Sequence, residues 1–130
     1  MKRINLLLII LILLAGCSEL GTRVENTTDY QDEPLQEILK AEDQVKLAFV
    51  LLHEKEMIAG IRVNTFSRFQ KKKIAADLQK KIEKAYPELN VTVSADSKVL
   101  LETEKLMDQK NKDEYGKKIK EIQSIEKEQT

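Results

Sequence analysis

Residues 45–64, VKLAFVLLHEKEMIAGIRVN, decide the fold of this chain. The first eight residues are a β-type run that is apolar on both faces over most of its length. The polar segment 53–56 follows, and from Met57 onward Ala59, Ile61 and Val63 point one way while Ile58 and Gly60 point the other. Two such runs joined by about four polar residues predict a β-hairpin, although the turn lacks an Asn-Gly signal.

A helix is predicted directly after the hairpin. Ser67 and Gln70 have the spacing of a capping box, and Pro87 ends the helix near Tyr86. Apolar residues at helical spacing form one stripe of this segment, which indicates an amphipathic helix lying on a sheet. The stripe consists of Ile74, Ala75, Leu78, Ile82 and Ala85.

Residues 89–95 alternate between apolar and polar side chains, which predicts a third strand with one buried and one wet face. Its polar face carries Asn90, Thr92 and Ser94. A further helix, capped by Asp96 or Ser97, is expected to follow. On the N-terminal side of the hairpin, Asp32 and Pro34 indicate the start of a short helix that ends near Lys40 or Ala41.

The resulting order is helix, strand, strand, helix, strand, helix. A right-handed crossover makes the second and third strands parallel. The simplest sheet has three strands, with the third beside the first and antiparallel to it, and with helices on one face. We therefore expect a small α+β sandwich over residues 34–107. The charged tail 108–130 is expected to be partly helical and to bury little.

The N-terminal segment has the layout of a secretory signal. Lys2 and Arg3 precede an apolar run that ends in Leu14-Ala-Gly-Cys17. The run from Ile4 to Gly16 is too short for a transmembrane helix. The Leu-Ala-Gly-Cys ending resembles the bacterial lipobox. This resemblance implies a signal peptide over residues 1–16, cleavage between Gly16 and Cys17, and a diacylglycerol on the Cys17 sulfur.

Cys17 is the only cysteine of the chain, so it has no internal disulfide partner. A plain secretory signal with a free thiol is the competing interpretation. Residues 17–33 are polar without an apolar period, and we expect them to form a flexible tether. The mature protein would be attached to the extracytoplasmic face of the cell membrane through its N-terminal lipid.

Composition excludes some functions. The 22 basic residues fall to 20 when Lys2 and Arg3 are removed, against 22 acidic ones, so the mature chain is slightly acidic. This balance argues against nucleic-acid binding.

The single histidine, His53, is interpreted as a solvated turn residue and not a metal ligand. Ser67, Ser94 and Ser97 occupy cap or turn positions, and no glycine-rich phosphate loop occurs.

We therefore predict no catalytic residues, no metal, no cofactor and no small-molecule substrate. Five lysines of the predicted helix are the candidate contacts to an anionic surface: Lys71, Lys72, Lys80, Lys81 and Lys84. They would face anionic lipid or wall polymer. The alternative is an ordinary solvated helix face, which is favoured because no aromatic residue interleaves the lysines.

The chain resembles the YhcN/YlaJ family of sporulation lipoproteins. The resemblance lies in the lipobox signal, in Val45, Ala48 and Val50 of the first strand, in Tyr86-Pro87, and in Val91-x-Val93-Ser94-x-Asp96. It also includes Ile74-Ala75-Ala76 and covers roughly residues 35–107.

This resemblance implies a role in the spore envelope, in sporulation, germination or outgrowth, with envelope or spore proteins as partners. The family supplies no catalytic residues, and the missing catalytic constellation makes us expect a non-enzymatic protein. It also implies a location at the spore or forespore membrane. The expected fold resembles the BON domain as well, a small envelope module proposed to bind phospholipid. The alternative function is a general envelope binding module for phospholipid or wall polymer.

Overall fold

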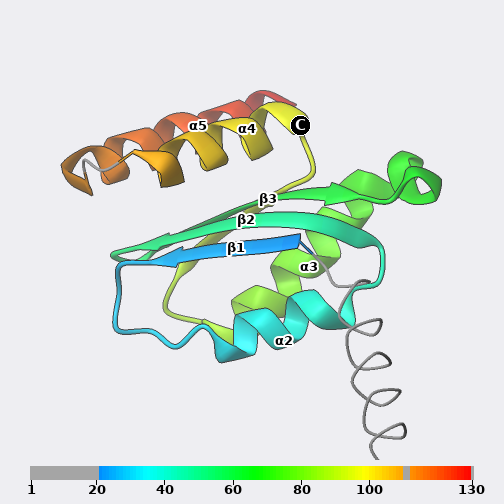
Figure 1. The fold of residues 1–130 in the computed structure, drawn as a ribbon, viewed down its shortest axis with the longest axis horizontal. Coiled ribbons are helices and arrows are strands. Elements are labelled where there is room, and N and C mark those ends of the chain that lie inside the picture. Colours follow the sequence, from blue (N-terminus) through cyan, green and yellow to red (C-terminus); the bar gives the residue numbers. More distant parts are fainter. Residues whose placement is uncertain (1–20, 110–111, 130) are drawn as a thin grey trace, which may run out of the picture.

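The computed structural model describes residues 21–109 and 112–129, which form a four-stranded mixed sheet between two helical layers (Figure 1). The strands are β1 (Gly21–Asn26), β2 (Val45–His53), β3 (Glu56–Val63) and β4 (Asn90–Ser94). The helices are α2 (Glu33–Ala41), α3 (Lys71–Ala85), α4 (Ser97–Asp108) and α5 (Tyr115–Gln129), with short 3-10 helices η2 (Thr65–Gln70) and η3 (Lys112–Glu114). The α+β class is as predicted.

The predicted hairpin is confirmed, with a tighter turn than expected. β2 and β3 pair antiparallel from Val45↔Val63 to His53↔Glu56, so the turn contains only Glu54 and Lys55. Glu54 has a φ of 55°, in the left-handed region that Asn and Gly usually occupy. The strong pairing of the two strands therefore holds a turn that lacks the usual turn residues.

The strand order is β1-β2-β3-β4, which corrects the predicted three-stranded sheet. β4 is parallel to β3, as the crossover rule predicts. It does not lie beside β2, because β1 pairs with that strand in parallel, from Gly21↔Leu47 to Asn26↔Leu52.

β1 lies within the predicted tether, so that prediction is wrong for its residues, whereas residues 17–20 lie outside the described part. The segment that follows β1 is also held to the domain. The Thr27 amide donates to the Leu52 carbonyl oxygen at 3.0 Å, and Asn26 Nδ2 donates to Asp32 Oδ1 at 2.6 Å. β1 was missed because it is an edge strand whose side chains are exposed or half-buried, with no apolar face to detect.

Helices cover both faces of the sheet, not one as predicted: α2 and α3 pack on one face, α4 and α5 on the other (Figure 1). The doubly apolar character of β2 explains this arrangement. Its residues Ala48, Val50 and Leu52 belong to the core beneath α2 and α3. Leu51 belongs to the second core together with Ile58, and Phe49 packs against that core.

The C-terminal segment contributes more to the core than predicted. Its helical character is confirmed, and Tyr115, Ile119 and Ile122 of α5 are buried in the second core. α5 partly covers the face of β4 that was expected to be wet: Asn90 stays exposed, Thr92 is half-buried, and only the C-terminal end of the strand is fully covered. Ser94 is consequently buried, and its Oγ donates a hydrogen bond to Glu126 Oε2.

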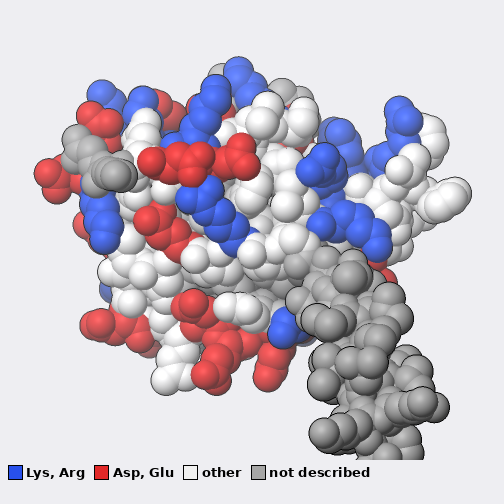
Figure 2. All heavy atoms as spheres, viewed as in Figure 1, with Lys and Arg blue, Asp and Glu red and all other residues white. Residues whose placement is uncertain are grey.

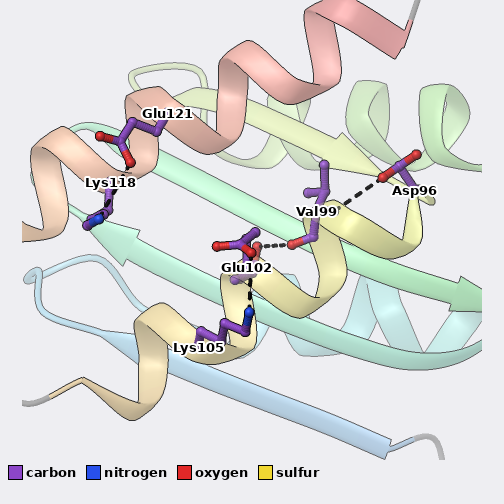
Figure 3. A network of polar contacts seen from close by, with 7 residues as sticks. Asp96, Val99, Glu102, Lys105, Lys118 and Glu121 are labelled. Atoms are coloured by element: carbon purple, nitrogen blue, oxygen red, sulfur yellow. Dashed lines mark hydrogen bonds and ion pairs between the residues drawn. The ribbon is translucent and has the colours of Figure 1, made fainter.

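The helix starts agree in part with prediction. Asp96 caps α4 by accepting from the amide of Lys98 at 2.8 Å and from that of Val99 at 3.3 Å. Figure 3 shows the contact to Val99. The predicted capping box at Ser67 and Gln70 is wrong. Asn64 Oδ1 instead accepts from the Ser67 amide at 2.8 Å and starts η2, so α3 begins only at Lys71.

Pro34 lies in the first turn of α2 as expected, but the Asp32 side chain does not cap that helix. It accepts from Asn26 instead, which ties the start of α2 to the end of β1. The loop between β1 and α2 is therefore fixed by side-chain hydrogen bonds that a sequence pattern does not reveal.

Candidate functional site

The predicted lysine surface is divided between two sides of α3. Lys71, Lys72 and Lys80 line a groove of about 390 Å³ between α3, the edge strand β4 and the C-terminal part of α5. Lys81 points elsewhere, and its Nζ lies 3.2 Å from Glu42 Oε2 at the end of α2. Lys84 is exposed and does not line the groove. The five lysines therefore do not form one continuous basic surface.

The groove is mixed in charge and has an apolar floor. Ala75, Val93 and Ala95 contribute to its lining, and its three lysines are accompanied by three acidic residues, Glu83, Asp96 and Glu126. The acidic residues partly offset the lysines, so the groove attracts a polyanion less strongly than a purely basic surface would.

The edge of the sheet beside the groove is partly closed by a side chain. Gln79 Oε1 accepts a hydrogen bond from the Val93 amide of β4 at 3.0 Å. An amide satisfied in this way is less available for pairing with an added strand, so strand addition at β4 is opposed.

His53 is not a solvated turn residue, contrary to prediction. It ends β2 with a half-buried ring that packs edge-on against Tyr115, with the two ring centroids 5.5 Å apart. Its Nδ1 lies 2.9 Å from Thr27 Oγ1, which in turn lies 3.1 Å from the Leu52 carbonyl oxygen. The hydrogen bond between His53 Nδ1 and Thr27 Oγ1 fixes the ring in place.

The Tyr115 hydroxyl joins three segments at this point. It donates to the Gln109 carbonyl oxygen at 3.1 Å and lies 3.1 Å from Glu25 Oε2 of β1. Burial, followed by the hydrogen bond to Glu25, raises the pKa of Tyr115 above its usual value. This group of His53, Thr27, Glu25 and Tyr115 therefore holds α5 against the sheet, and its polar atoms are used in structural contacts.

The serines considered as nucleophiles are used structurally as well. Ser94 donates to Glu126, and Ser97 begins α4 behind its Asp96 cap. Within residues 21–109 and 112–129, no group of three or more His, Cys, Asp or Glu side chains is placed to hold a metal ion. In the same ranges no helix is long and apolar enough to cross a bilayer.

The most unusual surface feature is η2, which we call the aromatic turn (Thr65–Gln70). Phe66 is 97% exposed and Phe69 is 92% exposed. A 3-10 helix has three residues per turn, which places these two rings one above the other on one side, while Ser67 is buried. The Arg68 guanidinium lies 5.4 Å from the centroid of the Phe69 ring.

Cationic residues surround the aromatic turn. From Arg62 to Lys73 the chain has five basic side chains and no acidic one. Figure 2 shows Lys and Arg side chains gathered around the lobe that η2 forms at the right of the view, whereas acidic side chains predominate along the lower edge. Sequence reasoning missed this site because it placed Ser67 and Gln70 at a helix cap. The Phe66-Ser-Arg-Phe69 spacing beside three successive lysines was the signal available.

Comparisons with protein-family models, with curated proteins and with solved structures each found no match. The resemblance to the YhcN/YlaJ family thus stays a prediction that rests on the residues quoted for it.

Proposed function

We propose that this protein is a lipid-anchored, non-enzymatic lipoprotein on the extracytoplasmic face of the cell membrane that acts in the spore envelope. The observation that carries the proposal is the Leu14-Ala-Gly-Cys17 sequence after a basic start and an apolar run, with Cys17 as the only cysteine. Two or three acyl chains at Cys17 would hold the protein firmly, because a single chain gives only marginal membrane binding.

The role in sporulation, germination or outgrowth rests on the family resemblance. The location would be the spore or forespore membrane. Constant expression through growth, without a rise in the developing spore, would contradict the sporulation role and leave the lipid anchor untouched.

Cys17→Ala is expected to yield unprocessed or mislocalised protein that takes up no fatty acid, because the acylated sulfur is absent. Metabolic labelling with a fatty acid, followed by membrane fractionation, measures this. Ser18→Ala is the matched control and should be processed and labelled normally. Label in the Cys17→Ala protein, or an unmodified Cys17 in protein from the native cell, would refute the anchor.

The alternative function is a general envelope binding module for phospholipid or wall polymer. The groove at Lys71, Lys72 and Lys80 is the observation that favours it. Replacing these three lysines by glutamine is then expected to weaken co-sedimentation with an anionic wall polymer by about a hundredfold, at about 1 kcal/mol for each lysine near an anionic surface.

The matched control removes the same charge from exposed sites outside the groove, as Lys40→Gln, Lys55→Gln and Lys98→Gln together. This control should bind the polymer nearly as well as the wild type. An equal loss in both triple variants would assign the binding to net charge, and no binding by the wild type would exclude the polymer as a ligand.

A further inference from the structure

The aromatic turn and the start of β1 lie at the same end of the sheet. Gly21 is paired with Leu47 of β2, and Leu47 is paired with Arg62 of β3. β3 ends at Val63 and leads directly into the turn, so the two features lie at one end of the strands (Figure 1). The start of β1 and the exposed phenyl rings are therefore at the same end of the domain.

The distance available between Cys17 and this end of the sheet is short. Only four residue steps separate Cys17 from Gly21, and a fully extended chain spans about 3.5 Å for each step, or about 14 Å in all. A lipid on Cys17 would hold this end of the domain close to the bilayer surface. The long tether expected from the sequence would not have imposed such a restriction.

We propose that the aromatic turn is a membrane-docking element. Phe66 and Phe69 insert into the interfacial region of an anionic phospholipid bilayer, and the surrounding arginine and lysine side chains contact its phosphate groups. The proposal rests on the lipid anchor proposed above, because that anchor brings the turn to the membrane. It adds an orientation: the sheet end that carries Gly21 and the turn faces the lipid.

The chemistry of the turn matches this occupant. Transfer of an exposed phenyl ring from water into the bilayer interface is favourable. A second attachment beside an acyl chain makes membrane binding stable. The cationic residues Arg62, Arg68 and Lys73 are exposed and suited to anionic headgroups. A protein partner is less favoured because the rings project from a convex turn and line no groove among the described pockets.

The chain contains no tryptophan, so one introduced indole reports on its own surroundings. Phe66→Trp and Phe69→Trp, each in the full chain purified from the native cell, are reconstituted into vesicles of phosphatidylglycerol and phosphatidylcholine. We expect the emission to shift to shorter wavelength and to be quenched by brominated lipid. Both positions are almost fully exposed, so neither substitution should change the thermal unfolding midpoint.

Leu101→Trp is the matched control, because Leu101 is also exposed but lies on α4, on the other face of the sheet from α3. Its emission should remain that of a water-exposed indole. Vesicles of phosphatidylcholine alone should produce a weaker shift at position 66. An equal shift in neutral vesicles would overturn the role of the cationic residues.

Three further outcomes separate this proposal from the anchor and from a protein partner. Mass spectrometry of the same preparation reports whether Cys17 is acylated. If it is, and the indole at position 66 stays exposed to water, docking is refuted while the anchor stands. A shift with an unmodified Cys17 supports docking and refutes the anchor. A shift that requires native membranes containing proteins, and is absent with pure lipid, overturns docking on lipid.

Discussion

Tyr115→Ala is expected to lower the free energy of unfolding by about 3–5 kcal/mol, the range for removing a large buried side chain. Tyr115 is fully buried at the first position of α5 and packs against the His53 ring. Its hydroxyl also contacts Gln109 and Glu25. The substitution would leave a cavity between α5 and the sheet and remove a hydrogen-bond partner from each of these residues.

Urea denaturation followed by circular dichroism measures the loss. Tyr115→Phe retains the ring and removes only the hydroxyl, so a smaller loss of about 1–2 kcal/mol is expected. Tyr30→Phe is the matched control: it removes a hydroxyl whose hydrogen bond to Glu88 is exposed, and it should change stability by less than about 0.5 kcal/mol. A Tyr115→Ala protein as stable as the wild type would show that α5 does not pack as described.

The raised pKa of Tyr115 adds a test at alkaline pH. Burial is the main cause, and the folded protein therefore holds the phenol protonated above the usual pKa of 10.0. The unfolded chain loses this proton first, so the associated stability is present below that pH and is lost as the pH rises through the folded pKa. The free energy of unfolding of Tyr115→Phe should therefore fall less steeply with rising pH than that of the wild type in this alkaline range. Part of the remaining pH dependence is due to Tyr86, because burial raises the pKa of that residue too.

The sequence predicted those elements whose apolar pattern records burial. The hairpin and the helix through Ile74, Leu78 and Ile82 were found because each of these has a face in the main core. β1 was missed because an edge strand is stabilised by backbone pairing, and Val24 alone packs apolar surface against that core. Backbone hydrogen bonds leave no signature in the side-chain pattern.

The second helical layer was underestimated for a related reason. Apolar residues of α5 are few and have charged neighbours in the sequence, but Tyr115, Ile119 and Ile122 pack in one buried cluster with Leu51 and Ile58. A narrow apolar stripe is sufficient when the facing strand is apolar on that side too. The double-sided apolar character of residues 45–52 was the evidence for two covered faces, and it was visible in the sequence.

The candidate surface features were predictable to a smaller extent. The lysines of α3 were identified, but their division between the groove and Glu42 depends on where α2 and β4 lie. The exposure of Phe66 and Phe69 depends on a 3-10 helix started by Asn64, and aromatic residues at this spacing would usually be assigned to a core. Only the tertiary structure distinguishes an exposed pair from a buried one.

Gly60→Val is expected to destabilise the fold by about 3 kcal/mol, because an added side chain would overpack the contact between β3 and α4. A Cβ at position 60 would lie 2.6 Å from the Leu100 Cα and 3.1 Å from the Leu100 backbone nitrogen. These are backbone atoms of α4, so no rotation of a side chain relieves the clash, and the helix itself must move away from the sheet.

Gly116→Ala is the matched control because a Cβ there meets nothing within 4 Å, at the second position of α5. Alanine is the better helix former, so this variant should be more stable than the wild type by about 0.5–1 kcal/mol. Urea denaturation of both variants measures the two changes in the free energy of unfolding. Changes of opposite sign would separate the close approach of α4 to β3 from any general effect of replacing glycine. A Gly60→Val protein as stable as the wild type would mean that α4 does not lie on β3 at this distance.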